Sequence, residues 1–201
     1  MPYLPHPTSF FPRMTDFLAV LNALHPLSPA LAAALRARAV PENWPARHRL
    51  LQPGQVARRV NFLETGLVRG YNLHDGREVS SWFMREGDFV ISIASFFTQT
   101  PAEECLELLE PGHGVSLGYE QLQELYRDFP AFNFHGRVLT ERYYVLSEQR
   151  ARHLRAHPAR ERYDLLLRDF PAVFQRVAVQ HIASHLGMAP KTLSRLRAQR
   201  S

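Results

Sequence analysis

The sequence predicts an α+β protein in which a β-barrel or jelly roll is followed by a long helix and a C-terminal helix-turn-helix. Three observations lead to this fold class. Glycines separate short runs rich in Val, Phe, Tyr and Trp between residues 49 and 118, which is typical of an all-β unit with short strands. Apolar residues then recur at helical spacing over residues 131–157. Residues 180–200 contain two short amphipathic segments separated by Gly187.

Two short helices are expected ahead of the β region. Residues 15–24 have apolar side chains at helical spacing. Ser28 followed by Pro29 is a helix cap followed by a first-turn proline, so a second helix should begin there and end before Pro41. Residues 1–12 are rich in proline and are expected to be irregular.

The β region contains a hairpin signal. Asp75 and Gly76 lie between residues 67–71 and 79–83, two runs of the kind that form strands. An Asp-Gly pair favours the tight turn whose twist matches that of an antiparallel hairpin. We therefore expect these two runs to pair, with the turn at Asp75 and Gly76.

Helices are expected again after the hairpin. Residues 91–98 are ambiguous and fit a short helix inside the β region, and residues 118–128 predict a helix that ends before Pro130. A long helix should follow over residues 131–157. One of its faces is typical of a coiled-coil partner helix, which predicts a homodimer, and the alternative is a helix packed on its own β-domain. The side chains of this dimer helix seam are Phe132, Gly136, Leu139, Tyr143 and Leu146.

The end of the chain predicts a helix-turn-helix. Ile182 and Leu186 share one helix face, Gly187 suits the residue that leaves that helix, and Pro190 suits the first turn of the next helix. An αα-hairpin that merely packs on its neighbours is the alternative. The polar side of the second helix suits phosphates and guanine edges in a DNA major groove. That side consists of Lys191, Thr192, Ser194, Arg195 and Arg197.

The distribution of charge favours a DNA-binding helix-turn-helix over a helix pair that only packs on its neighbours. The chain has 24 basic and 19 acidic residues, and no Asp or Glu follows Asp169. The five basic residues in the last 32 positions therefore account for the whole formal excess of +5. A basic patch on a reading element is the electrostatic footprint of a nucleic-acid-binding protein. The candidate contacts to double-stranded DNA are Arg176, Gln180, His181, Lys191, Thr192, Ser194, Arg195 and Arg197. The rival interpretation is a signalling module whose helix-turn-helix binds a protein.

Composition limits the class of protein further. Of the 201 residues, 45% are apolar and 21% are charged, as in soluble globular proteins. The lone cysteine, Cys105, excludes an intrachain disulfide and a four-cysteine metal site, and it fits a small core residue. The N-terminus has no basic region before an apolar run, and no apolar stretch is long enough to span a bilayer. We therefore expect a cytoplasmic protein without a signal peptide or a membrane partner.

Two histidine pairs raise the possibility of a metal site. His153 and His157, like His181 and His185, stand four residues apart and share a helix face. Neither pair has a third ligand nearby in the sequence, so we expect ordinary exposed histidines and no metal. The sequence has no Gly-x-Ser-x-Gly, no glycine-rich phosphate loop and no His-Glu-x-x-His, so no enzyme is expected.

This order of elements resembles the Crp/Fnr superfamily of bacterial transcription regulators. The strongest similarities lie in residues 62–69, 175–177, 181–187 and 192–195, and the ending at Ser201 is similar to that of short Bacteroidetes-type members. The resemblance implies a cyclic-nucleotide-binding-type β-roll (residues 1–130), a dimerisation helix (131–157) and a winged-helix-like DNA-binding domain (158–201). It also implies a homodimer on a pseudo-palindromic operator, with RNA polymerase as a candidate partner. Ala189 departs from the family, whose members usually have Ser or Thr there, so the second helix is expected to be weakly capped.

The effector pocket is the largest departure from the family pattern. Nucleotide-binding members hold the cyclic phosphate with a Gly-Glu pair and a later Arg followed by Ser or Thr. Here Gly87-Asp88 takes the first position, residues 102–105 have no Arg, and no Lys or Arg lies between Arg85 and Arg127. Because an acidic loop repels a phosphate, we expect no cyclic nucleotide as cofactor. The pocket is expected to be filled by its own side chains or to take a neutral or cationic ligand. Its degenerate residues are Gly87, Asp88, Phe89, Ser95, Glu103 and Glu104.

Overall fold

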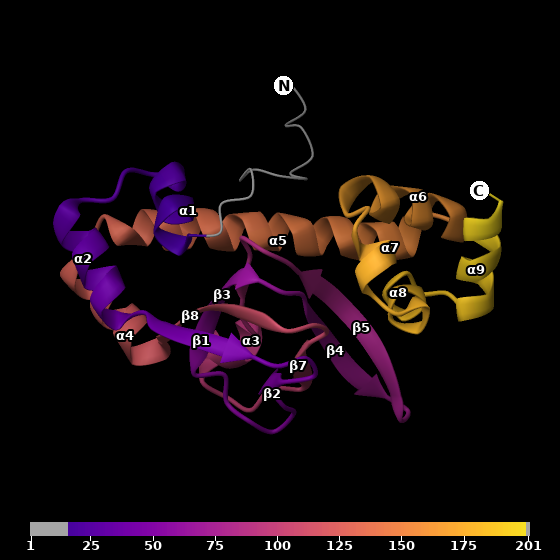
Figure 1. The fold of residues 1–201 in the computed structure, drawn as a ribbon, viewed down its shortest axis with the longest axis horizontal. Coiled ribbons are helices and arrows are strands. Elements are labelled where there is room, and N and C mark those ends of the chain that lie inside the picture. The colour runs from indigo at the N-terminus through magenta and orange to yellow at the C-terminus, as the bar shows by residue number, and fades with distance from the viewer. Residues whose placement is uncertain (1–15, 200–201) are drawn as a thin grey trace.

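Two four-stranded antiparallel sheets form a β-roll in this computed structural model, which describes residues 16–199. The strand orders are β1-β8-β3-β6 and β2-β7-β4-β5. Figure 1 shows the roll below a long helix, α5, that runs along the molecule. The predicted irregular segment 1–12 lies outside the described residues. The strands are β1 (Val40–Trp44), β2 (Arg49–Leu51), β3 (Arg59–Thr65), β4 (Val68–His74), β5 (Arg77–Met84), β6 (Phe89–Val90), β7 (Glu104–Leu108) and β8 (Gly112–Gly118).

The predicted hairpin is confirmed. Strands β4 and β5 pair antiparallel from Val68 with Met84 to His74 with Arg77. Asp75 and Gly76 connect them with φ angles of 49° and 72°, which is the left-handed backbone that this two-residue turn requires. The hairpin therefore extends one sheet as a long two-stranded arm, whose outer end Figure 1 shows at the lower right.

Short helices cover the roll where the sequence predicts them. Ser28 caps α2 by accepting a hydrogen bond at Oγ from the Leu31 backbone N–H at 3.2 Å, and Asp16 caps α1 in the same manner. The ambiguous segment 91–98 contains a helix, as the sequence allowed. These helices are α1 (Phe17–Leu24), α2 (Pro29–Arg38), α3 (Ile93–Thr98) and α4 (Tyr119–Asp128).

The long helix α5 (Phe132–Ala156) packs tightly on the roll of its own chain. The Tyr143 hydroxyl accepts a hydrogen bond from the Phe89 backbone N–H at 2.9 Å. A Cβ atom added to Gly136 would lie 2.2 Å from the Tyr126 hydroxyl, so only glycine permits this close approach. Phe132 is buried in the same core.

The predicted dimer helix seam packs largely on the roll of its own chain, and its role as a dimer contact stays a prediction. Most of the seam packs there, as the alternative interpretation stated, because an apolar stripe fits any apolar surface of suitable shape, and the half-buried Leu146 lies outside that core. The residues concerned are Phe132, Gly136, Leu139, Tyr143 and Leu146. The opposite face of α5 exposes Phe134, Tyr144 and Val145 instead.

The C-terminal part is helical throughout, with no strand between residues 159 and 199. The predicted helix-turn-helix is confirmed: Gly187 has a φ of 61° between its two helices, and Ile182 and Leu193 are completely buried. Pro171 ends α6, and a single further turn, α7, was not predicted. The helices are α6 (Ala159–Asp169), α7 (Val173–Arg176), α8 (Val179–His185) and α9 (Pro190–Ala198).

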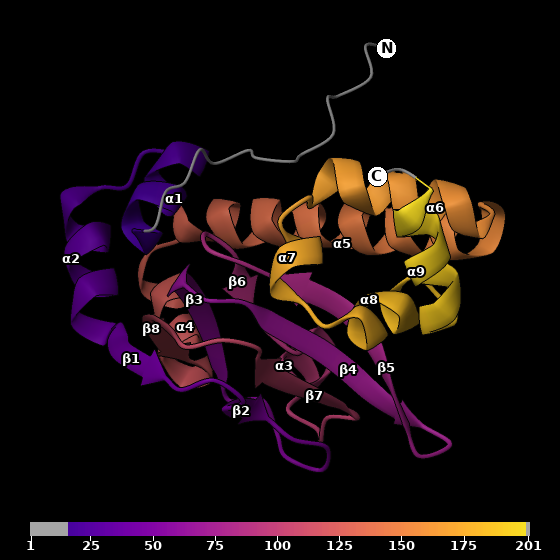
Figure 2. The same cartoon turned by 45° about the vertical axis from the view of Figure 1, so that its right-hand side comes forward.

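These helices do not stand apart from the roll. Helix α8 packs against β5, and Figure 2 shows it beside the β4–β5 arm. Leu67, which precedes β4, belongs to the same apolar cluster as Ile182 and Leu193. None of the helices within residues 16–199 combines the length and the apolar composition that crossing a bilayer requires.

Candidate nucleic-acid interface and its contact with the roll

Helix α9 presents a polar face to solvent. Leu193 and Leu196 anchor the helix in the core beneath it. Lys191, Ser194 and Arg195 are exposed on the other side. This arrangement follows from the helical period, which places the two leucines on one face and the polar residues on the opposite face. The Ala189 side chain makes no capping hydrogen bond, as expected for alanine.

The other predicted DNA contacts differ in exposure. Gln180 is exposed at the start of α8, while Thr192 and Arg197 are half-buried. The Arg197 guanidinium lies 6.0 Å from the centre of the Phe174 ring. The exposed part of the candidate interface therefore centres on Lys191 and Arg195.

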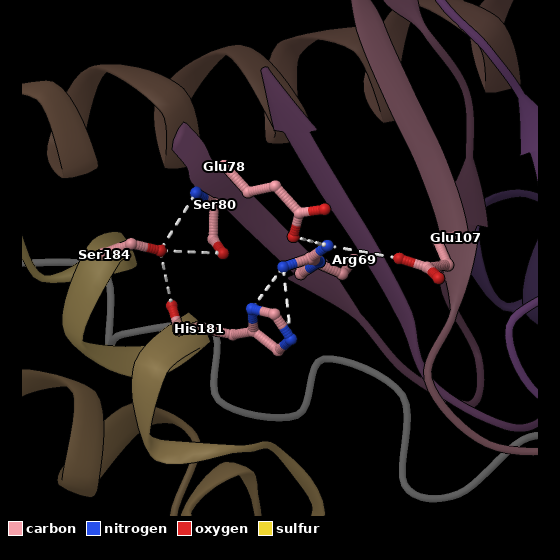
Figure 3. Close-up of polar contacts among 6 residues, drawn as sticks. All are labelled: Arg69, Glu78, Ser80, Glu107, His181 and Ser184. Atoms are coloured by element: carbon pink, nitrogen blue, oxygen red, sulfur yellow. Dashed lines mark hydrogen bonds and ion pairs between the residues drawn. The ribbon is translucent and has the colours of Figure 1, made fainter. Parts of the chain in front are cut away.

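His181 faces the roll, in contrast to its predicted role (Figure 3). Its ring nitrogens contact Arg69 Nη1. Arg69 is 1% exposed, and its Nη2 donates to Glu78 at 2.6 Å and to Glu107 at 3.1 Å. Burial, then the Arg69 charge, lowers the pKa of His181. The imidazole of His181 is therefore engaged with Arg69 on the roll, and its predicted contact to DNA stays a prediction.

Arg176 is also engaged with the roll. Its Nη2 donates to Glu86 Oε1 at 2.6 Å, its Nη1 to Glu86 Oε2 at 3.1 Å, and its Nε to Glu110 at 3.2 Å. A further bond joins Nη2 to the second Glu110 oxygen, and hydrogen bonding to Glu110 and Glu86 raises the pKa of Arg176. Two carboxylates therefore neutralise Arg176 in this structure, and its predicted contact to DNA stays a prediction.

Serine side chains complete the contact between α8 and the roll. Ser184 Oγ accepts a hydrogen bond from the Ser80 backbone N–H at 3.1 Å and lies 3.0 Å from Ser80 Oγ. Figure 3 shows this pair next to the Arg69 cluster. The sequence gives no signal for this contact, because the two serines are 104 positions apart and neither has a distinctive neighbourhood.

His185 packs against the roll and does not extend into solvent. Its ring lies 5.0 Å from the Phe83 ring, and burial lowers its pKa to about 3. The expectation of exposed histidines is thus wrong for His181 and His185. The expected absence of a metal stays a prediction. Within residues 16–199, no group of three or more His, Cys, Asp or Glu side chains is placed to hold a metal ion.

Most residues of the predicted effector pocket are used in structural contacts. The Gly87 N–H donates to the Leu63 carbonyl at 2.8 Å, so this donor is already used within the roll. Ser95 Oγ accepts from the Ala57 N–H at 2.9 Å and donates to a backbone carbonyl. Glu103 is exposed. These three residues do not line the cavity described next.

A cavity of about 410 Å³ lies between the roll, α5 and the C-terminal helices, and we call it the roll–helix cavity. Of the predicted pocket residues, Asp88, Phe89 and Glu104 line it. Asp88 Oδ2 accepts from the Arg85 backbone N–H at 3.0 Å, and burial raises the pKa of Asp88 and of Glu104.

The cavity wall also contains three cationic side chains, contrary to the expected acidic pocket. Arg85 directly follows β5, and Arg142 and Arg150 come from α5. Sequence reasoning missed the last two because they lie outside the acidic interval. One signal in the sequence could have identified Arg150. It follows Leu146 at the spacing of the apolar seam, so it is a charged residue on a helix face that is otherwise apolar.

Comparison with solved structures identifies the fold. CLP from Xanthomonas campestris, described as a c-di-GMP responsive global regulator, is similar with a TM-score of 0.69 at 19% identity, over 86% of this chain and 91% of that chain. FixK2 from Bradyrhizobium japonicum is similar with a TM-score of 0.70 at 18% identity, over 80% and 83% of the chains. A Eubacterium rectale protein of the crp/fnr family is similar with a TM-score of 0.67 at 13% identity, over 86% and 83%.

No protein-family profile and no curated protein matches the sequence. The likeness is therefore one of structure, and it extends over the roll, the long helix and the C-terminal helices together. The chain has the fold of the Crp/Fnr transcription regulators.

Proposed function

We propose that this chain is a DNA-binding transcription regulator that reads its operator with helix α9. The observation that carries the proposal is the exposed face of α9, where Lys191, Ser194 and Arg195 project from a helix whose opposite side is anchored in the core. Arginine and lysine on such a face match the guanine edge and the phosphates of a major groove. Transcriptional regulators share this fold, which supports the same class of function here.

Replacing Arg195 with alanine is expected to weaken specific DNA binding by about 1–3 kcal/mol, since a bidentate base contact is worth that much. Fluorescence anisotropy measures it, with an operator first selected from a random pool. The control is Arg127→Ala, an exposed arginine on α4. If the folded Arg195→Ala protein binds the operator as tightly as the control, α9 does not read DNA through this residue.

The salt dependence separates the proposal from its rival. A DNA-binding protein releases counterions from the phosphates, so its affinity should fall steeply as salt rises. A signalling module whose helix-turn-helix binds a protein should show no DNA binding even at low salt.

We also propose that two copies pair through the outward face of α5, so that two reading helices meet two half-sites. That face exposes Tyr144 at 64%, Val145 at 49% and Phe134 at 39%, an apolar group on a helix side that faces away from the roll. Exposed apolar side chains along one helix side suit an interaction surface.

Replacing Val145 with glutamate is expected to shift the protein from dimer to monomer, because pairing would bury an unpaired charge. Light scattering at micromolar concentration measures the mass. Val40→Glu is the matched control, since Val40 is 40% exposed on β1, away from this face. A wild-type protein that is already monomeric, or a Val145→Glu protein that remains dimeric, contradicts the proposed interface.

Cyclic AMP has no place in the proposed mechanism. The position at which related members hold the phosphate maps near residues 102–105, which include Glu103 and Glu104 and no Arg. Asp88 is buried in the adjacent wall. Carboxylates at this position repel a phosphate instead of binding it.

A further inference from the structure

We propose that the roll–helix cavity binds a small organic monocarboxylate with an apolar body, whose carboxylate pairs with Arg150. This binding site goes beyond the proposed DNA-binding function and does not depend on it. It also differs from the phosphate position of related regulators, because its cation comes from the long helix α5.

Arg150 is a partly buried cation without a balancing acid. Its Nη2 donates to the Ser80 carbonyl at 3.1 Å. Within residues 16–199, its Nε has no hydrogen-bond partner, and no carboxylate lies within ion-pair distance of its guanidinium. Burial lowers its pKa to about 10, so it is still charged at neutral pH. An uncompensated buried charge is unfavourable, and a bound anion would relieve it.

The other charges at the cavity are already balanced in part. Asp88 lies in the field of Arg142 and Arg85, and Asp169 accepts from Arg168 Nε at 2.8 Å. Glu104 also lines the cavity, so the three arginines Arg85, Arg142 and Arg150 face two further acids, Asp88 and Glu104, which leaves one positive charge and favours a singly charged anion. A dianionic phosphate would add a second negative charge close to these carboxylates.

His185 supplies a second polar group in the same wall. Among the described residues, its buried Nδ1 has no hydrogen-bond partner. Because this ring is neutral and already donates to the backbone of Ser80 and Ser81, Nδ1 is its accepting nitrogen. It can therefore take a donor group on the body of the ligand but not the carboxylate itself. Arg150 and His185 come from α5 and α8, so a ligand held by both would join the long helix to the helix-turn-helix.

The rest of the cavity is suited to an apolar body. Its volume of about 410 Å³ lies within the usual range for sites of small molecules. Aromatic and aliphatic side chains from the roll, α5 and α6 surround the polar groups. They are Trp82, Phe83, Phe89, Leu146, Leu166 and Phe170.

Titration calorimetry on the full chain tests the site. The probes are phenylacetate, cinnamate, indoleacetate and octanoate, each compared with its neutral amide, and phenyl phosphate and cyclic AMP form separate arms. We expect saturable binding of at least one carboxylate and binding at least about tenfold weaker for its amide, because the charge-assisted bond is lost. Cyclic AMP and phenyl phosphate are expected not to saturate at low micromolar concentration.

Variants then assign the carboxylate to Arg150. Arg150→Gln should weaken carboxylate binding at least about tenfold, and Arg150→Lys should recover only part, since lysine keeps the charge but lacks the fork. Arg155→Gln, at an exposed arginine of the same helix, should bind like wild type. Circular dichroism checks that each variant is folded. The proposal is overturned if no carboxylate binds, if an amide binds equally well, if a phosphate binds more tightly, or if folded Arg150→Gln binds like Arg155→Gln.

Discussion

Replacing Arg69 with alanine is expected to lower the free energy of unfolding by about 3 kcal/mol, because the change leaves carboxylates without their cation. Arg69 is 1% exposed, bonds Glu78 and Glu107, and lies 3.9 Å above the Tyr71 ring. Glu107 remains mostly buried at 16% exposure, whereas Glu78 at 41% can regain water, so the effect should lie at the lower end of the range for buried pairs. Urea denaturation followed by circular dichroism measures it.

The control for Arg69 is a neighbouring arginine with no such role. Arg77 is exposed at the start of β5, and Arg77→Ala should change stability by less than about 0.5 kcal/mol. The double variant Arg69→Ala with Glu107→Gln should recover part of the loss, because it removes the unpaired charge together with its partner. Equal stability of Arg69→Ala and Arg77→Ala would show that the cluster does not hold α8 on the roll.

Acidification from pH 7.5 to pH 5 is expected to lower the free energy of unfolding by about 2 kcal/mol through His185 alone. The pKa of His185 is about 3 in the folded chain against 6.5 for an unperturbed histidine. Protons therefore bind the unfolded chain preferentially. The full contribution is present above pH 6.5 and is lost at about 1.4 kcal/mol per unit as the pH falls towards 3. Burial is the main cause, and the nearby Arg150 charge adds to it.

Replacing His185 with leucine removes this titration and places an apolar side chain against Phe83. Urea titrations at both pH values should therefore show His185→Leu losing about 2 kcal/mol less than wild type on acidification. His74→Leu, on an exposed histidine of the hairpin end, should follow wild type. Identical losses in wild type and His185→Leu would mean that His185 is hydrated and titrates normally.

The sequence by itself determined the elements whose signals are local. The hairpin at Asp75 and Gly76 and the turn at Gly187 follow from the left-handed backbone that those residues adopt readily. The start of α2 follows from a cap and a proline at Ser28 and Pro29. The separation of the anchored and exposed faces of α9 follows from helical periodicity. Each of these signals acts within a few residues, so no tertiary information is needed.

Only the tertiary structure decided which surface each face meets. The apolar seam of α5 showed that one side would be buried, but its period is the same for a partner helix and for the chain's own roll. Arg176 was predicted to contact DNA because it lies in a basic tail, yet in the structure it pairs with Glu86, 90 positions earlier. The acidic interval between Arg85 and Arg127 contributes no cation to the cavity wall. Arg150 of α5 supplies one instead. Pairing of charges over such separations depends on how the segments pack, which no local pattern records.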